Sequence, residues 1–485
     1  MSDYRVAMVS FECLPFVKVG GLADVVGTLP VYLKKNKIDV RVVIPLHKKV
    51  DREKFQLKDT GQELLIPLRG KLETARIYQG AIADVPVYFI ENDKYFNREE
   101  IYRTKDGDYP DNPERFIFFS KAVLETLKAI DFKADIVHCN DMQTGLIPAY
   151  LKILYRTDAF FNKTKTVFTI HNIAYQGFYS KEVFYLAGFN DMDWTPEKLE
   201  YYGGINFIKA GIVYSDTVTT VSKTYAVEIQ TLPESGRGLG GVLTSRKEDL
   251  YGIVNGIDCE EWNPETDKFI AEKFSSKDLG DKNICKKDLQ KICGLPAENV
   301  PLFGMVSRID SLKGFDLLCV IIDELAKLAM QLVILGSGDK FYQDRLSEFG
   351  LKYRKKLSVN LKFDNTLAHK IYAGGDFFLM PSSAEPCGLS QMIAMRYGTI
   401  PIVHKTGGLA DTVEQFNSKT KKGTGIVFEK YLTETLLQAI KSGLKIYKNK
   451  SLLTAVRNNA LKKDFSWNES VKEYMSVYEL TMKKI

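Results

Sequence analysis

Short apolar runs alternate along this chain with longer stretches in which apolar residues recur at helical spacing. The runs are continuous and rich in β-branched residues, as in strands buried on both faces of a parallel sheet, and the alternation is typical of βαβ units. The predicted strands are Val6–Phe11, Val40–Ile44, Val85–Ile90, Asp135–His138, Thr166–Ile170 and Thr217–Val221 in the first half, and Pro301–Val306, Gln331–Leu335, Asp376–Met380 and Ile400–Val403 in the second. Helices are predicted between them, for example over Arg115–Ile130 and Phe315–Leu328.

A domain boundary is predicted near Leu250–Asn263. There a strand-like segment ends in the turn dipeptide Asn255-Gly256 and is followed by polar residues and Pro264. The chain has 485 residues, too many for one compact core. We therefore predict an α/β protein with an N-terminal Rossmann-like domain over residues 1–250 and a second over residues 251–465. The tail, residues 466–485, is predicted to be an amphipathic helix that packs back on the N-terminal domain.

The composition is that of an ordinary globular protein, with 45% hydrophobic and 26% charged residues and a net charge of +6. Basic clusters such as Lys352–Lys356 are short and more typical of solvated helix faces than of a nucleic-acid surface. The seven cysteines are scattered and odd in number, which argues against disulfides and thiolate metal sites. No apolar run reaches the roughly 18 residues of a membrane span. We expect a cytoplasmic protein with neither nucleic acid nor membrane as a partner.

One heptapeptide pattern, K-x-G-G-L-A-D, occurs once in each half of the chain. Lys18–Val26 and Lys405–Val413 agree at all but two of nine positions, and each copy is predicted to follow a strand and open a helix. Paired glycines can turn with positive φ and let a ligand approach the backbone, while a helix N-terminus favours anions. The match can also reflect nothing more than a good strand-to-helix turn. We interpret it as one device used by two similar domains, with ligands beyond the carboxyl ends of their strands.

Three further loops follow predicted strands and carry polar side chains. In Ser307–Gly314, Arg308 and Lys313 suit phosphate oxygens, although both could be solvated surface charges. In Pro381–Ser390, the Glu385 carboxylate can accept hydrogen bonds from sugar hydroxyls, or it could only cap a helix. In Thr169–Gly177, His171 is one of only five histidines and is either a site residue or a structural one. No metal-ligand spacing involves it, so no metal is expected.

Together these motifs resemble bacterial glycogen synthases and plant starch synthases, the ADP-glucose-dependent branch of the GT-B glycosyltransferases (family 5). The resemblance runs from about Val6 to Trp467. It rests on KVGGLADV at Lys18, YPDNPERF at Tyr109, TIHNIAYQG at Thr169, GIVNGID at Gly252, SRIDSLKG at Ser307, EPCGLSQ at Glu385 and KTGGLADTV at Lys405. Their order and spacing are more specific than any one motif. The resemblance implies two Rossmann-like domains that face each other across a deep cleft.

The resemblance also implies the reaction, which is transfer of glucose from ADP-glucose to the non-reducing 4-hydroxyl of an α-1,4-glucan with retention of configuration. The implied partners are ADP-glucose or ADP and glycogen or a maltooligosaccharide, with no cofactor and no metal. The implied catalytic residues are Lys18, His171, Arg308, Lys313 and Glu385. The implied donor-binding residues are Lys18, Gly20, Gly21, Asp24, Asn255, Arg308, Lys313, Phe363, Glu385, Cys387, Gly388, Leu389, Ser390, Gly407, Gly408 and Leu409, and the acceptor side is assigned to Tyr95, Asp141 and Tyr175.

Within that set the family assigns individual roles. Lys18 and its glycines bind donor phosphate, while Arg308 and Lys313 neutralise the diphosphate leaving group. Glu385 holds the transferred glucose, and His171 contacts its 6-hydroxyl. The remaining assignments are that Phe363 lies against the nucleotide base, that Asp24 and Asn255 lie near the nucleotide or glucan, and that Gly407, Gly408 and Leu409 complete the sugar pocket.

Two departures from the family pattern bear on activity. Asn140-Asp141-Met142-Gln143 stands where the family has H-D-W-H, and Ser383 replaces a basic residue. The first concerns the acceptor side and the second removes one cation near phosphate. Two alternatives therefore stay open, a GT-B glucosyltransferase that uses UDP-glucose or makes a small glucoside, and a homologue that binds glucan without catalysis. The sequence leaves the oligomeric state open.

Overall fold

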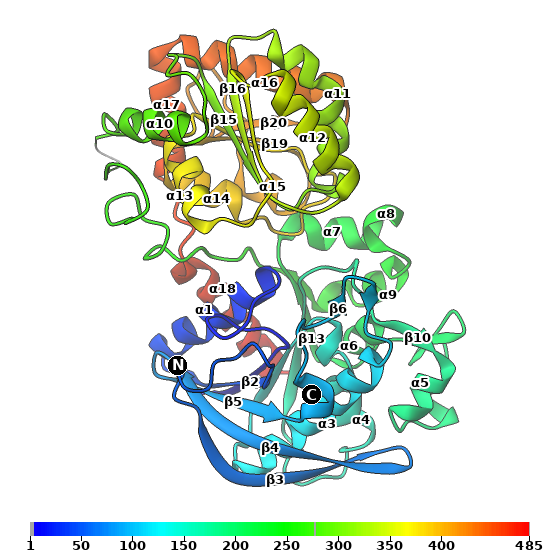
Figure 1. Cartoon of the computed structure of the whole chain (residues 1–485). Helices are drawn as coiled ribbons and strands as arrows, with labels where there is room; N and C mark the ends of the chain where they lie inside the picture. Colours follow the sequence, from blue (N-terminus) through cyan, green and yellow to red (C-terminus); the bar gives the residue numbers. More distant parts are fainter. Residues whose placement is uncertain (1–3, 276–277, 485) are drawn as a thin grey trace. The chain divides into compact units, whose positions relative to one another are not determined.

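The computed structural model describes residues 4–275 and 278–484 and divides into two compact units. Unit 1 comprises Met1–Val221, Ala226–Ile253 and Trp467–Ile485, and unit 2 comprises Ser222–Tyr225 and Val254–Ser466. The division of the chain falls between Ile253 and Val254, and the C-terminal helix belongs to unit 1. Each unit is built on its own sheet (Figure 1).

Unit 1 contains a nine-stranded sheet in the order β14-β13-β9-β8-β1-β2-β5-β4-β3. Seven strands are parallel: β1 (Arg5–Val9), β2 (Asp39–Pro45), β5 (Val85–Glu91), β8 (Ile136–Asn140), β9 (Lys165–Ile170), β13 (Thr217–Thr220) and β14 (Leu250–Gly252). From β1 the chain adds strands β2 and β5 on one side, and it then adds β8, β9, β13 and β14 on the other. The strand order therefore reverses between β1 and β8. The six strands predicted in this half are confirmed, with ends shifted by a few residues.

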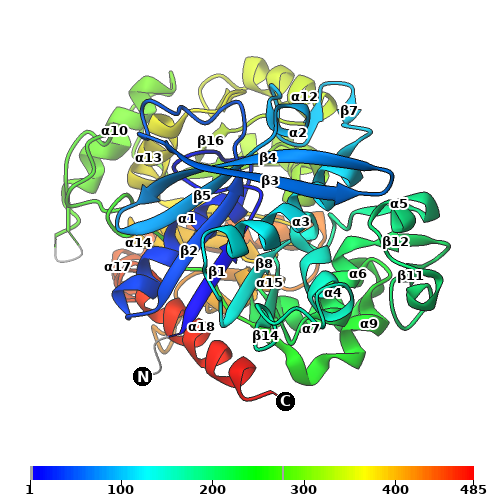
Figure 2. The same ribbon diagram turned by 90° about the horizontal axis from the view of Figure 1, so that it is seen from below.

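The edge of this sheet is an antiparallel hairpin that the hydrophobic pattern did not predict. Strands β3 (Lys58–Leu68) and β4 (Lys71–Ile82) add to β5, and Figure 2 shows them as a long two-stranded ribbon. Most residues of β3 are exposed, whereas the central strands β1 and β8 are almost entirely buried. A second, three-stranded sheet in unit 1 has the order β10-β12-β11, with β10 at Phe178–Ser180, β11 at Glu200–Tyr201 and β12 at Gly204–Asn206.

The helices of unit 1 cover the parallel part of its sheet. The longest are α1 (Gly21–Lys35), α3 (Asn112–Ala129) and α18 (Trp467–Met482). Helix α3 begins three residues earlier than predicted because Pro113 is favoured in the first turn of a helix. Helix α18 packs against α1 and β9, and the hydroxyl of Tyr478 lies 2.7 Å from Nδ1 of the buried His138. The tail thus completes the core of unit 1.

Unit 2 contains a six-stranded, fully parallel sheet in the order β17-β16-β15-β18-β19-β20. The strands are β15 (Leu302–Val306), β16 (Gln331–Leu335), β17 (Leu357–Asn360), β18 (Phe377–Met380), β19 (Ile400–His404) and β20 (Ile426–Phe428). Helices lie on both faces (Figure 1), the main ones being α10 (Lys282–Ile292), α11 (Phe315–Ala326), α12 (Lys340–Lys352), α13 (Asn365–Gly374), α16 (Thr433–Lys448) and α17 (Lys450–Leu461). This is the doubly wound Rossmann order, and it reverses between β15 and β18. The four strands predicted here are confirmed.

Candidate active site

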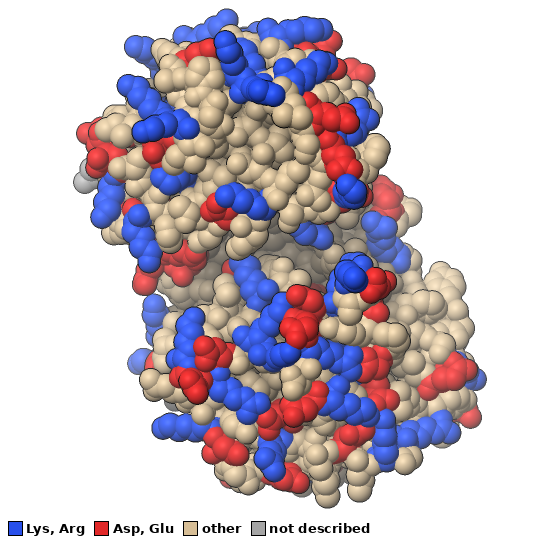
Figure 3. Space-filling view, viewed as in Figure 1, with Lys and Arg blue, Asp and Glu red and all other residues tan. Residues whose placement is uncertain are grey.

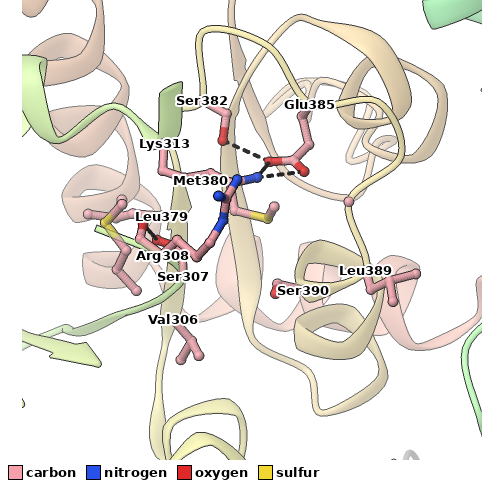
Figure 4. Close-up of a pocket in the computed structure, with 12 residues that line it drawn as sticks. Val306, Ser307, Arg308, Lys313, Leu379, Met380, Ser382, Glu385, Leu389 and Ser390 are labelled. Carbon is pink, nitrogen blue, oxygen red and sulfur yellow. Dashed lines mark hydrogen bonds and ion pairs between the residues drawn. The ribbon is translucent and has the colours of Figure 1, made fainter. Parts of the chain in front are cut away.

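A pocket of about 120 Å³ lies at the carboxyl ends of β15 and β18 in unit 2 (Figure 4). Doubly wound sheets bind ligands where the strand order reverses, and this pocket lies at that position. It is lined by Met305, Val306, Ser307, Arg308, Lys313, Leu379, Met380, Ser382, Glu385, Gly388, Leu389 and Ser390. Two of the loops singled out in the sequence, Ser307–Gly314 and Pro381–Ser390, therefore meet around one cavity.

A lysine–carboxylate pair forms the polar wall of this pocket. The Nζ atom of Lys313 donates to both carboxylate oxygens of Glu385, at 2.8 and 2.6 Å, and Ser382 Oγ donates to Glu385 at 2.9 Å (Figure 4). The side chain of Glu385 is 8% exposed and that of Lys313 is 20% exposed. Such a buried pair is held in a fixed geometry, because separating it would leave either charge uncompensated.

The backbone around Lys313 explains how its side chain is placed. Asp310 caps the short 3-10 helix Ser311–Lys313 by accepting from the Lys313 N–H. Gly314 ends that turn with a φ of +83°, and a Cβ there would lie 2.3 Å from the carbonyl oxygen of Pro381. A glycine is required at this position by both its conformation and its neighbour. The turn is thus pressed against the loop that carries Glu385.

Arg308 and Phe363 are more exposed than the buried pair. Arg308 lines the pocket with a guanidinium group 3.7 Å from the Asp310 carboxylate, and its side chain is 60% exposed. Phe363 follows β17 and is 89% exposed, outside the residues that line the pocket. An exposed ring and an exposed cation are both free to contact a bound molecule.

Asn255 and Cys387 are buried beside each other in unit 2. The Asn255 backbone N–H donates to the Cys387 thiol, whose pKa is raised to about 12 by burial. Cys387 is therefore a neutral thiol at physiological pH. The Oδ1 atom of Asn255 is buried and has no hydrogen-bond partner among the described residues. A buried amide oxygen without a partner is uncommon in folded proteins.

The two K-x-G-G-L-A-D loops differ in structure. In the first, Gly20 is extended (φ −138°), Gly21 opens α1, and a Cβ on either glycine would meet nothing within 4 Å. In the second, Gly407 has a φ of +43°, and a Cβ there would lie 2.0 Å from the Glu385 carbonyl oxygen. Of these two glycines, only Gly407 has the positive φ that a glycine allows. The first loop also follows β1 only after a long connection, whereas the second follows β19 directly.

The second loop serves the packing of unit 2. A Cβ on Gly408 would lie 2.0 Å from the Cys387 carbonyl oxygen, and the Gly408 N–H donates to the Glu385 carbonyl at 3.0 Å. The Leu409 side chain is fully buried in a cluster with Met395 and Val403. None of residues 407–409 lines the pocket. The loop thus supports the Glu385 loop from behind, and its place in the sugar pocket stays a prediction.

The two loops predict different responses to alanine. Gly408→Ala should lower the thermal midpoint by roughly 5 °C or more, since backbone must move to admit the Cβ. Gly21→Ala places its methyl group in open space, and we expect a midpoint within about 1 °C of wild type. Differential scanning calorimetry of both variants is the measurement. Equal midpoints for the two variants would contradict the assignment of different roles.

In unit 1, the loops after β1, β8 and β9 carry the polar residues singled out in the sequence. The first is tied down by Glu12, which the sequence patterns did not indicate. This buried carboxylate accepts from the Val19 and Gly20 N–H groups at 2.5 and 3.0 Å and from the Tyr102 hydroxyl at 2.6 Å. Burial raises the pKa of Glu12 despite these hydrogen bonds. Two backbone donors of the glycine loop are thus satisfied within the protein.

Lys18 stands at the mouth of the same loop. Its Nζ lies 2.7 Å from the Asp24 carboxylate, and its side chain is 44% exposed. Burial raises the pKa of Asp24, and the Lys18 charge opposes that rise. The exposed ammonium group can exchange this partner for an anion, because exposed ion pairs are weak.

His171 lies after β9 with a defined tautomer. Its Nε2 lies 2.8 Å from Asn140 Oδ1, and the amide nitrogen of Asn140 donates to the Val9 carbonyl at 3.0 Å, which fixes the orientation of the amide. Burial lowers the pKa of His171 to about 3, so the ring is neutral at pH 7. Nε2 therefore carries the proton, and Nδ1 is a hydrogen-bond acceptor. Asn140, which replaces a family histidine, thus has a clear structural role.

Asp141 is buried beside His171 in a strained backbone conformation, with φ +56°. Its carboxylate accepts from the His171 N–H at 2.7 Å and from the N–H of Asn172. Burial nevertheless dominates and raises the pKa of Asp141 to about 7. A positive φ on a non-glycine residue next to buried polar groups is typical of functional sites.

The shifted pKa of Asp141 predicts a pH dependence of stability. Between pH 3.8 and about 7 the folded protein holds a proton that the unfolded chain releases, so this group's contribution falls as pH rises. Asp141→Asn keeps the oxygen acceptor and tolerates positive φ. We expect urea unfolding to show the variant gaining stability relative to wild type from pH 4 to 7. Parallel profiles for the two proteins would contradict the buried, protonated Asp141.

The two remaining acceptor-side residues have different environments. Tyr175 is 52% exposed in the loop after His171, where its ring is available to a ligand. Tyr95 is fully buried: its ring packs on Phe118 and its hydroxyl lies 2.5 Å from the Glu114 carboxylate. The prediction that Tyr95 contacts acceptor is corrected, because this side chain belongs to the core of unit 1.

Comparisons with known proteins agree with this arrangement. Residues 5–245 match the starch synthase catalytic domain, and residues 288–463 match glycosyl transferases group 1. Curated glycogen synthases from Geotalea daltonii and Thermotoga maritima are 45% and 46% identical over 99% of both chains. The chain belongs to the glycogen synthase family. It is a glycosyltransferase, as the motifs predicted.

Solved structures place the fold in the GT-B class. The catalytic domain of starch synthase IV from Arabidopsis thaliana, bound to ADP and acarbose, is 33% identical and superimposes with a TM-score of 0.91 over 100% of both chains. Sucrose-phosphate synthase from Thermosynechococcus elongatus, at 16% identity, shares the fold with a TM-score of 0.61 over 98% of both chains. Within residues 4–275 and 278–484, no group of three His, Cys, Asp or Glu could hold a metal ion. No helix in this part of the chain is long and apolar enough to cross a membrane.

Proposed function

We propose that this protein transfers glucose from ADP-glucose to the non-reducing 4-hydroxyl of an α-1,4-glucan, with retention of configuration. The observation that carries the proposal is the Lys313–Glu385 pair in a pocket at the strand reversal of unit 2. The family supports the reaction type. The ADP and acarbose bound to the Arabidopsis starch synthase support a nucleoside diphosphate sugar as donor and a glucan as acceptor.

In unit 2 the proposed roles follow from charge and exposure. Two of the three N–H groups of Lys313 bond to Glu385, so one remains for a phosphate oxygen. The exposed guanidinium group of Arg308 can donate paired hydrogen bonds to the same diphosphate. As the bond to glucose breaks, negative charge grows on the diphosphate. Each preorganised donor stabilises this charge and lowers the activation barrier by roughly 3–4 kcal/mol. Glu385 accepts from sugar hydroxyls and faces the positive charge that develops on the sugar ring.

In unit 1, we propose that Lys18 contacts donor phosphate across the open backbone at Gly20 and Gly21. We propose that His171 accepts a hydrogen bond at Nδ1 from the glucose 6-hydroxyl, which its neutral tautomer allows. Asp141 fixes the His171 backbone on the acceptor side.

Retention of configuration is proposed to proceed without a protein nucleophile. A double displacement uses two carboxylates about 5 Å apart, but Glu385 is the one carboxylate among the described residues that line the pocket. We propose instead that the leaving phosphate accepts the proton of the attacking hydroxyl. We also propose that no metal or cofactor takes part and that the enzyme works in the cytoplasm, where its seven free cysteines stay reduced.

The test is incorporation of labelled glucose into glycogen from ADP-glucose or UDP-glucose, with and without EDTA. We expect incorporation from ADP-glucose, unaffected by EDTA, and a product digested by an α-1,4-specific amylase. Incorporation from UDP-glucose alone would overturn the donor assignment. Binding of glycogen without release of ADP would favour the non-catalytic homologue.

A further inference from the structure

A group of aromatic side chains lies on the small three-stranded sheet of unit 1, outside the residues discussed so far. Phe178 on β10 is 53% exposed, and Tyr202, between β11 and β12, is 80% exposed. Tyr201 lies between them, with ring centroids 5.9 Å from Phe178 and 4.7 Å from Tyr202, both edge to face. Contiguous exposed aromatic side chains are a common feature of binding surfaces.

The backbone at Tyr202 is strained in order to present this ring. Tyr201 pairs with Gly204, so Tyr202 and Gly203 form a two-residue hairpin loop with φ of +46° and +79°. Loops with two positive φ values favour Asn-Gly, and a bulky residue at the first position is an outlier. The Glu200 carboxylate reinforces the turn by accepting from the Gly203 N–H at 2.7 Å. The strained backbone thus carries a ring that is 80% exposed and whose ring contact is the exposed edge-to-face pair with Tyr201.

Two of the three rings, those of Phe178 and Tyr201, lie against glycines. The Phe178 ring covers Gly204, where a Cβ would lie 2.6 Å from it, and the Tyr201 hydroxyl rests against Gly238. The rings of Phe178 and Tyr201 are therefore held in place before any ligand arrives, which reduces the entropy lost on binding. In Figure 3 the surface over β10 and its adjoining loop, located from Figure 1, is largely without Lys, Arg, Asp or Glu. That chemistry suits a neutral ligand.

The surface continues into the proposed acceptor loop. Only two residues separate Tyr175 from Phe178, and both are anchored: the Gly177 carbonyl accepts from the Phe207 N–H at 3.0 Å, and the Gln176 side chain donates to the Arg237 carbonyl. Exposed aromatic residues thus extend from the loop of His171 to the tip of the β11–β12 hairpin. A long polymer whose end is near His171 could remain in contact along this path.

We propose that Phe178 and Tyr202, with Tyr201 between them, form a second glucan-binding surface that holds an α-1,4-glucan chain away from the reacting end. The pyranose ring has an apolar face of C–H groups and an equatorial belt of hydroxyls, which match a tyrosine ring and its polar edge. The inference rests on the proposed function for the identity of the glucan. It predicts that long or branched acceptors bind more tightly than short ones.

The test compares Tyr202→Asn and Phe178→Thr with wild type and with Phe341→Ala, an exposed phenylalanine of unit 2 that serves as the control. Tyr202→Asn puts the favoured residue into the strained turn, so its thermal midpoint should equal or exceed that of wild type. We measure retardation in native gels that contain glycogen, without donor. Both unit 1 variants should lose about tenfold in glycogen affinity, and the control should not.

A kinetic arm separates this inference from the proposed function. With ADP-glucose as donor, the KM for glycogen should rise in both variants relative to the KM for maltotriose. Unchanged retardation, or equal losses in Phe341→Ala, would overturn the glucan surface. Light scattering that shows wild-type dimers lost in Tyr202→Asn would assign the surface to a second copy of the chain instead. Absence of any transfer by wild type would refute the proposed function, while retardation would still report on the surface.

Discussion

Glu385→Ala should lower kcat at least ~100-fold, because the variant loses the only carboxylate that lines the pocket among the described residues. The Glu385 side chain is 8% exposed and accepts three hydrogen bonds from Lys313 and Ser382. Removing it leaves the Lys313 ammonium group without a partner and takes away the acceptor proposed for sugar hydroxyls. The measurement is kcat with ADP-glucose and glycogen, together with a thermal midpoint to show that the variant is folded.

Glu429→Ala is the matched control for that variant. Glu429 also pairs with a lysine, Lys405, at 3.0 Å, but its side chain is 76% exposed and it is outside the pocket. An exposed pair contributes little to stability, so kcat and the midpoint should both stay near wild type. A kcat within a few-fold of wild type in Glu385→Ala itself would remove Glu385 from the catalytic residues.

The parallel sheets could be predicted from sequence because their strands are buried on both faces and leave continuous apolar runs. Gln331–Leu335, for example, is fully buried and was predicted with its correct ends. The β3–β4 hairpin could not, since Lys58–Leu68 is an edge strand with mostly exposed polar residues and has no such run. The sequence predicted two Rossmann-like domains but not the order of strands within each sheet. The structure supplies that order, and it reverses at β1 in unit 1 and at β15 in unit 2.

The site was predictable at the level of loops and less so at the level of contacts. Lys313 and Glu385 were singled out separately, and they lie 72 positions apart in the chain, so their pairing depends on the fold between them. Glu12 gave no signal, because a single glutamate after a strand has no motif of its own. The similar sequences of the two glycine loops do not give similar backbones. Gly20 is extended, whereas the equivalent Gly407 is left-handed, because the two glycines have different neighbours in the fold.

Lys313→Ala should also lower kcat at least ~100-fold, and more than it raises KM for ADP-glucose. The Lys313 Nζ has one N–H left after its two bonds to Glu385, and we expect that donor to strengthen as charge develops on the diphosphate. Loss of the lysine also leaves the Glu385 carboxylate with Ser382 as its remaining hydrogen-bond donor among the described residues. The matched control is Lys405→Ala, whose side chain is 54% exposed and pairs with Glu429.

The double variant Lys313→Ala/Glu385→Ala tests whether the two residues act as a unit. Each single change removes one charge and leaves its buried partner unpaired, so part of each loss is counted twice. The double variant should therefore lose far less activity than the product of the single losses, with a coupling of roughly 1–3 kcal/mol in transition-state free energy. The exposed pair Lys405 and Glu429, changed in the same cycle, should show coupling near zero. Additive losses at Lys313 and Glu385 would mean that the two side chains contact the substrate independently and that their pairing is incidental to catalysis.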